Sequence, residues 1–285
     1  IMLKIIEIIV VLGTVAGGYV LSHGQLGALW QPYELIIICG AAAGAFLIAN
    51  SMTVVKGVGA GVGAAFSGKA HWHKEGYMEL LSLLYEVFNK ARKNGLISIE
   101  EDIENPGGSE IFMRYHHVNQ TAKLVEFICD YLRIIASGNL SAIELESLMD
   151  QEIETAKHEA EAPAHAFNKV ADGLPGFGIV AAVLGIVITM GSLGGPPAEL
   201  GHHVAAALVG TFLGILFAYG FIAPLSSSME HDAQEGMKIY ECSKVCLLAM
   251  VNGIPPQLAV EFGRKVLPGP ERPTFAELDS ALRGR

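Results

Sequence analysis

The chain has 285 residues, of which 51% are hydrophobic and 17% are charged, and its mean hydropathy is +0.41. This composition excludes an ordinary soluble domain; because the charges gather in about residues 56–172 and 230–285, it indicates a membrane protein with a large water-facing part. The net charge of −10, without any basic stripe, argues against nucleic-acid binding.

Two apolar stretches near the start of the chain predict the first two membrane-spanning helices. The first covers Met2–Leu21 and the second covers about residues 33–50, while residues 23–32 between them carry no charge. A helix of about 20 apolar residues is long enough to cross a bilayer core. We therefore expect a pair of transmembrane helices in residues 1–52.

The charged middle of the chain, residues 53–172, predicts a helical domain in water. From about Tyr77 the apolar residues recur at the spacing of an amphipathic helix, which Asn94-Gly95 is expected to end. Residues 98–101, Ser-Ile-Glu-Glu, form a capping-box pattern for the next helix. Two further helices are expected over residues 118–136 and 141–165, the second of them interrupted near Pro163.

The longest apolar stretch predicts two more transmembrane helices in residues 173–227, where Glu199 is the only charged residue. The fourth span is expected over about residues 204–225. Pro175 falls in the first turn of the third span, and Pro224 falls near the end of the fourth. The two prolines either begin and end helices or shape a hinge on one side of the membrane.

The last part of the chain, residues 228–285, predicts one helix and a tail. The helix is expected over about residues 228–252, and the prolines at 255–256 and after Leu267 are expected to end regular structure. No segment has the pattern of a β-strand. The predicted fold is an all-α integral membrane protein with four transmembrane helices and a cytoplasmic helical domain.

Small residues recur at helical spacing on the third and fourth spans and form one face on each. They are Gly178, Ala182, Gly185, Thr189 and Ser192 on the third span, and Ala207, Thr211, Gly214 and Ala218 on the fourth. One interpretation is close helix packing in lipid. The other is that Thr189 and Thr211 turn their hydroxyls toward a polar route, although threonine can also bond to its own helix backbone.

Basic residues flank the spans on one side only. The short connections 23–32 and 193–203 contain no Lys or Arg, whereas Lys4, Lys56 and Lys169 lie near the opposite ends of the spans. The positive-inside rule therefore places both termini and the long middle segment in the cytoplasm.

The interiors of the predicted spans contain no ionisable side chain, because Glu7, Glu34 and Glu199 fall near span ends or in a loop. Proton and cation routes in membranes nearly always use such a side chain. If these spans move ions, the carboxylate must come from a partner subunit. The sequence also lacks HExxH, Walker, nucleophile-elbow and CxxC motifs, which argues against an enzyme, a metal site or a bound cofactor.

A group of charges surrounds the expected turn at Gly95. Arg92 and Glu100 bracket this turn, and Lys90 lies close to it in the sequence. Such a cluster is either a solvated surface or a docking site for a partner with complementary charge.

Seven segments, in order along nearly the whole chain, resemble the MotA group of flagellar stator subunits in the MotA/TolQ/ExbB proton channel family. They are LGTVAGGY at 12–19, EEDIENP at 100–106, MDQEIE at 149–154, LPGFGIVAA at 174–182, VGTFLGIL at 209–216, AYGFIAPL at 218–225 and AVEFGRK at 259–265. Four spans with a long segment between the second and third distinguish this group from the three-span ExbB and TolQ proteins.

The resemblance implies a homopentameric ring in the bacterial inner membrane around a MotB dimer, whose membrane segment supplies the missing aspartate. It also implies that the cytoplasmic domain pushes the rotor protein FliG. Arg92 and Glu100 match the rotor-facing charged pair, Lys90 lies beside them, and Glu152 matches a further acidic position at the rotor face.

The same resemblance implies an ion route along the third and fourth spans, with Pro175 and Pro224 matching two functional prolines. Sodium-driven relatives are similar but carry an extra threonine in the cytoplasmic half of the third span, where this chain has Ala181 and Ala182, and this difference favours protons as the transported ion. Sodium remains the alternative, with the hydroxyls of Thr189 and Thr211 as ligands. An energy-coupling channel of the ExbB/TolQ kind is the alternative function.

Overall fold

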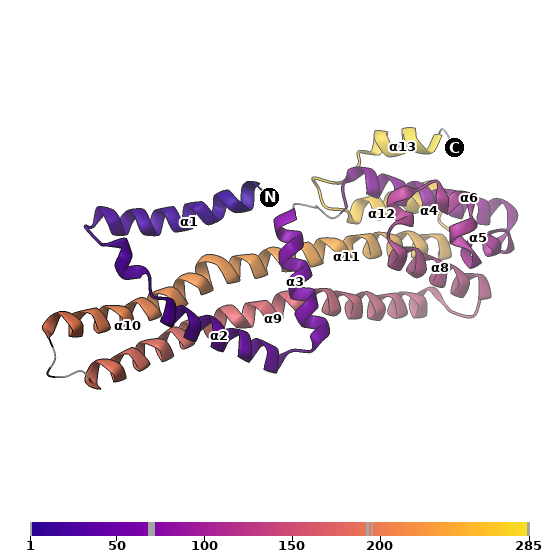
Figure 1. Ribbon diagram of the computed structural model, residues 1–285. Helices are drawn as coiled ribbons and strands as arrows, with labels where there is room; N and C mark the ends of the chain where they lie inside the picture. The colour runs from indigo at the N-terminus through magenta and orange to yellow at the C-terminus, as the bar shows by residue number, and fades with distance from the viewer. Residues whose placement is uncertain (1, 68–71, 192–193, 195, 284–285) are drawn as a thin grey trace. The chain divides into compact units, whose positions relative to one another are not determined.

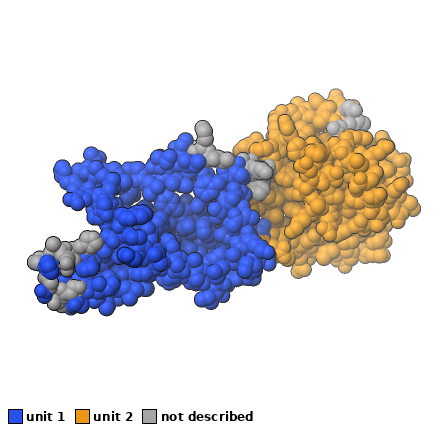
Figure 2. All heavy atoms as spheres, viewed as in Figure 1, with its two compact units in different colours: residues 1–69, 160–231 blue, residues 70–159, 232–285 orange. Residues whose placement is uncertain are grey.

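The structure is a computed structural model of the chain and describes residues 2–67, 72–191, 194 and 196–283. All regular elements within these residues are helices and none is a strand, so the expected all-α fold is confirmed (Figure 1). The helices form two compact units, residues 1–69 with 160–231 and residues 70–159 with 232–285 (Figure 2). These units group residues by contact, so the predicted division into membrane and cytoplasmic segments stays a prediction.

The first unit is built from apolar helices. They are α1 (Met2–Leu21), α2 (Pro32–Ala49), α3 (Met52–Ser67), the second part of α9 (Ala142–Gly191), α10 (Pro197–Phe217) and the beginning of α11 (Ala223–Val251). Within the part of the chain that the structure describes, four helical segments are long and apolar enough to cross a membrane, which confirms the four predicted spans by length and composition. The apolar helix α3 was not predicted from the sequence.

Helix α9 continues without a break through Pro163 and Pro175, so the expected interruption near Pro163 and the expected helix start at Pro175 were wrong. A proline inside a helix removes one N–H donor and leaves one carbonyl without its usual partner. Packing against other helices offsets this loss. At Pro163 the neighbour is α3, because a Cβ atom built on Gly57 would lie only 2.7 Å from Pro163 Cγ.

The second unit combines long and short helices around one apolar core. Its elements are α4 (Lys74–Asn94), η2 (Leu96–Ile99), α5 (Glu100–Glu104), η3 (Pro106–Gly108), α6 (Glu110–Met113), α7 (His116–Asn119), α8 (Ala122–Ser137), parts of α9 and α11, α12 (Pro256–Val266) and α13 (Phe275–Arg283). Fully buried side chains from α4 and α8, among them Leu80, Leu84, Ile128 and Leu132, fill the centre of this core. The sequence predicted α4 with its end at Gly95, but it merged α7 and α8 into one helix.

The predicted capping box at residues 98–101 is not formed. Gly95 has a positive φ of 84°, which ends α4, and the Ser98 hydroxyl donates a hydrogen bond of 2.7 Å back to the Gly95 carbonyl. The hydroxyl therefore closes the turn after α4, and α5 begins at Glu100 without a side-chain cap.

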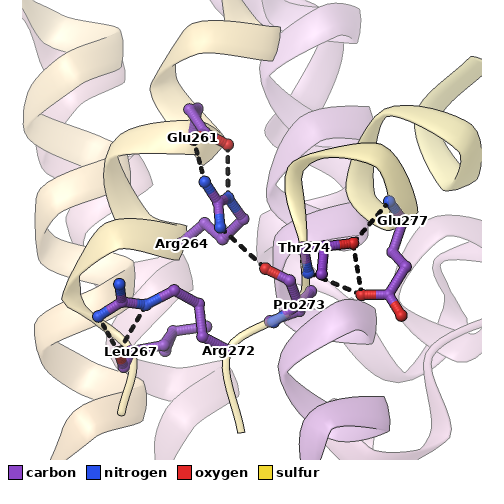
Figure 3. A network of polar contacts seen from close by, with 7 residues as sticks. All are labelled: Glu261, Arg264, Leu267, Arg272, Pro273, Thr274 and Glu277. Atoms are coloured by element: carbon purple, nitrogen blue, oxygen red, sulfur yellow. Dashed lines mark hydrogen bonds and ion pairs between the residues drawn. The ribbon is translucent and has the colours of Figure 1, made fainter. Parts of the chain in front are cut away.

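Helices α12 and α13 contradict the expectation that the prolines end regular structure. Arginine side chains replace the missing backbone bonds in the segment between them (Figure 3). The guanidinium of Arg264 is buried, pairs with Glu261 and donates to the Pro273 carbonyl at 2.9 Å. Arg272 donates twice to the Leu267 carbonyl, at 3.0 and 2.7 Å.

A capping box begins α13. The Thr274 hydroxyl and backbone N–H both donate to Glu277 Oε2, and the Glu277 N–H donates back to the hydroxyl at 3.2 Å (Figure 3). Hydrogen bonds from Lys74 and Thr274 lower the pKa of Glu277 to about 2. The Thr-Phe-Ala-Glu pattern at 274–277 was the sequence signal for this helix.

Candidate ion route and charged surface

The third and fourth spans meet along their small residues, and we call this contact the small-residue seam. It is formed by Gly178, Ala181 and Gly185 of α9 with Ala207, Gly210 and Gly214 of α10. The two helices lie side by side (Figure 1). A Cβ atom built on Gly178 would lie 3.0 Å from the Gly210 carbonyl oxygen, and one built on Gly185 would lie 3.0 Å from Ala207 Cβ. The small residues therefore allow the helix backbones to approach closely.

The hydroxyl side chains predicted for the ion route lie at or beside this seam. Thr189 is buried, and its hydroxyl donates to the Gly185 carbonyl of its own helix at 2.8 Å. Thr211 is half-buried, and its Cα atom would lie 3.2 Å from a Cβ atom on Gly178. The backbone nitrogen of Ala182 lies near Gly210. Thr211 and Ala182 therefore lie at the seam near Gly178 and Gly210, whereas Thr189 lies one turn beyond Gly185 on α9. The part of these three residues in ion movement stays a prediction.

Glu34 also reaches the seam, which the sequence analysis missed. Its Cγ atom would lie 3.5 Å from a Cβ atom on Gly210, and its Oε2 atom is buried. Glu34 is the third residue of α2, so its position near a span end suggested exposure. The packing of α2 against α10 could not be inferred from residue spacing.

The fourth span contains a π-helical turn, η4 (Ala218–Ile222), which ends two residues before Pro224. Within it the Ala223 N–H donates to the Ala218 carbonyl, five residues earlier. Because Pro224 has no N–H to donate to the Gly220 carbonyl, the widened turn fits the proline into one helical path from α10 to α11. The proline is therefore neither the end of the helix nor a break in it. Its role as a hinge stays a prediction.

The second unit presents Arg92 and Glu100 on its surface at the two ends of the Gly95 turn. Within the described part of the chain, neither side chain makes an ion pair. Lys90 differs, because its ammonium pairs with Asp102 at 2.6 Å, and Asp102 also accepts a hydrogen bond from Ser109 at 2.7 Å. Arg92 and Glu100 are therefore available for a partner, whereas the charge of Lys90 is already balanced.

An apolar groove adjoins Arg92. Its lining includes Leu96, Leu140, Met250 and Ile254. Ile97, in the turn between Arg92 and Glu100, is 84% exposed. Apolar side chains beside unpaired charges are typical of protein interaction sites.

Glu152 lies on a different surface, in a cleft lined by Lys123, Glu126, Asp130 and Tyr240. It accepts a hydrogen bond of 2.7 Å from the Tyr131 hydroxyl. Burial and this hydrogen bond raise the pKa of Tyr131, so the phenol stays protonated. None of the residues lining this cleft also lines the groove beside Arg92.

Comparisons with known proteins cover nearly the whole chain. Residues 5–95 match the family model "Motility protein A N-terminal", and residues 121–241 match that of the MotA/TolQ/ExbB proton channel family. Motility protein A of Salmonella typhimurium is 49% identical over 282 residues, which cover 99% of this chain and 95% of the relative.

Two solved structures have the same fold. The flagellar MotAB stator complex from Bacillus subtilis matches with a TM-score of 0.69 and 25% identity, over 90% of this chain and 92% of that chain. The structure of C. jejuni MotAB matches with a TM-score of 0.72 and 18% identity, over 93% of this chain and 95% of that chain.

Proposed function

Since this chain belongs to the motility protein A family, within the MotA/TolQ/ExbB proton channel proteins, we propose that it is a flagellar stator subunit that forms a proton channel with MotB. The observation that carries this proposal is 49% identity to a motility protein A along 99% of the chain. The aligned residues include both the four apolar helices and the charged unit, so the match covers the membrane part and the water-facing part of the chain. The motility relatives favour the stator over an energy-coupling channel of the ExbB/TolQ kind.

The chain conducts protons only together with MotB, because the middles of its own four spans hold no carboxylate. A MotB dimer supplies an aspartate there. Each proton that passes first neutralises this aspartate by binding to it and then leaves it ionised again. One charge crossing 100 mV releases about 2.3 kcal/mol, which is enough to shift an assembly between two packings. Five copies of the chain form a ring around MotB, and the small-residue seam lets their spans repack as the ring moves.

The ring lies in the bacterial inner membrane with both termini and the charged unit in the cytoplasm. The one-sided distribution of lysines supports this orientation. The charged unit pushes the rotor protein FliG through Arg92, Glu100 and the apolar groove beside them. Glu152 offers a second contact on its own surface.

The test of this function is swimming of a strain that lacks its own stator, complemented with this chain and its MotB. Swimming speed is measured while external sodium is varied at fixed pH and after a protonophore is added. If the stator is driven by protons, the swimming speed does not change with external sodium and falls to zero when the protonophore is added. Speed that follows sodium would overturn the choice of ion, and a complex that is assembled and binds FliG but drives no rotation would overturn the function.

We expect charge reversal at the Gly95 turn to uncouple the motor without blocking the channel. Arg92→Glu and Glu100→Lys each replace an attraction to FliG by a repulsion, an effect of about 1 kcal/mol at an exposed site and more where the contact excludes water. Swimming slows in each variant, while MotB binding and proton flow stay unchanged. The matched control is Lys265→Glu on the exposed side of α12. Equal speeds in all three variants would remove Arg92 and Glu100 from the rotor contact.

A further inference from the structure

Glu34 carries an acidic group to which the comparisons assign no role. Its Oε2 atom is buried and has no hydrogen-bond partner among the described residues. A carboxylate oxygen that is shielded from water without a hydrogen-bond partner is unfavourable, and a proton or another ligand at this oxygen would supply the missing partner.

Gly210 creates the space in which Glu34 lies. A Cβ atom at this position would lie 3.5 Å from Glu34 Cγ, 3.3 Å from Ala181 Cβ and 3.6 Å from the Ala182 nitrogen. The Glu34 side chain of α2 therefore packs against Gly210 of α10, beside the contact between α9 and α10 and one residue from Thr211. This is the seam along which the ion route is proposed.

No basic side chain is near enough in the sequence to neutralise Glu34 within these helices. Residues 5–55 and 170–237 contain no Lys or Arg. Glu199, His202 and His203 are the titratable groups of α10, and α9 has none from Gly178 to Gly191. A proton is therefore the cation by which the Glu34 carboxylate becomes neutral.

We propose that Glu34 is a proton-binding site on the ion route, contributed by this chain in addition to the MotB aspartate. The inference rests on the proposed function. Glu34 lies near the end of α2 that follows the lysine-free connection, so it accepts a proton from the outer side. The carboxylate becomes a carboxylic acid, returns to a carboxylate when the proton moves inward, and no other bond changes.

The test compares Glu34→Gln with Glu7→Gln in cells that carry MotB, by the rotation speed of a small bead on the flagellar filament. Glutamine has the shape of glutamate but cannot take up a proton. Glu7 is an exposed acid on α1, paired with Lys4 at 3.3 Å, and serves as the control. We expect Glu34→Gln to lower the speed about tenfold, as for loss of a titrating group inside a membrane, and Glu7→Gln to leave it unchanged.

Infrared difference spectra of the chain–MotB complex at two pH values give a readout that does not depend on rotation. Glu34→Gln removes one protonated-carboxyl band if Glu34 binds a proton. Wild-type speed and an unchanged spectrum in Glu34→Gln overturn the inference, while the stator function stands. A wild-type chain that drives no rotation instead overturns the proposed function.

Glu34→Asp is the second test variant, to be used if Glu34→Gln does not reach the membrane. It keeps the acid but withdraws it by one methylene from Gly210. We expect its speed to fall below that of the wild type and to respond to external pH over a different range. An aspartate variant that matches the wild type at every pH overturns the inference.

Discussion

Swimming is expected to stop in Gly214→Ala and to continue in Gly176→Ala. A Cβ atom on Gly214 would lie 2.7 Å from the Leu174 carbonyl oxygen and 3.0 Å from Gly178 Cα. Both are backbone atoms of α9 and cannot turn away, so the methyl group pushes α9 and α10 apart. Overpacking of this kind costs about 1–3 kcal/mol and removes the close backbone approach that small residues permit in lipid.

Gly176 is the matched control, because it lies on α9 two residues before Gly178 and a Cβ atom there meets nothing within 4 Å. The measurement is swimming speed together with the amounts of chain and MotB in the membrane. Normal swimming of Gly214→Ala would show that the seam is looser than these distances. Equal loss in both variants would show that any added methyl group on these helices disturbs the motor.

The four spans could be predicted because bilayer thickness demands long uncharged helices. Residues 173–227 contain one charged residue, and nothing except a pair of spans accounts for such a stretch. The small-residue faces were also readable, since steps of three and four place residues on one side of a helix. The sequence left open whether these faces serve packing or a route, and the structure brings both sets of residues to the same seam.

The failures have a common physical cause, because tertiary contacts outweighed local rules. Pro163 and Pro175 were expected at helix boundaries, yet packing by neighbouring helices keeps α9 continuous. Ser98 had a capping pattern but closes the preceding turn. The prolines after Leu267 led us to expect no regular structure there, so α13 was missed, although the capping-box pattern that begins at Thr274 indicates a helix start.

The structure changes the interpretation of two charged residues, Lys90 and Glu34, because each of them contacts a different helix. Lys90 and Asp102 are twelve residues apart and meet only because α4 and α5 fold together at the Gly95 turn. Glu34 reaches Gly210, which lies far along the chain on α10. Spacing in the sequence cannot report either distance, so neither the ion pair of Lys90 nor the buried Oε2 atom of Glu34 could be predicted.

The second large effect is expected in the charged unit, where Gly263→Ala lowers stability and Cys246→Ala restores part of it. A Cβ atom on Gly263 would overlap the Cys246 sulfur and lie 3.1 Å from the Cys242 sulfur and 3.2 Å from the Cys242 carbonyl oxygen. Both thiols are fully buried, and a hydrogen bond with Cys246, together with burial, raises the pKa of Cys242. The added methyl group therefore separates α12 from α11 at a cost of about 1–3 kcal/mol.

This loss of stability can be followed at a thiol in another helix of the same unit. Burial raises the pKa of Cys129 on α8 to about 12, so Cys129 reacts with a maleimide only when the unit opens. Heating the full chain in detergent with the reagent gives an opening temperature, which each kcal/mol lowers by about 2–4 °C in a protein of this size. Gly236→Ala, where the new methyl group meets nothing within 4 Å, is the control.

Because Gly263 and Cys246 are in contact, the effects of Gly263→Ala and Cys246→Ala on stability are not additive, and the double variant should open at a higher temperature than Gly263→Ala alone. Strictly additive losses would mean that the overlap at the two cysteines is not the source of the instability.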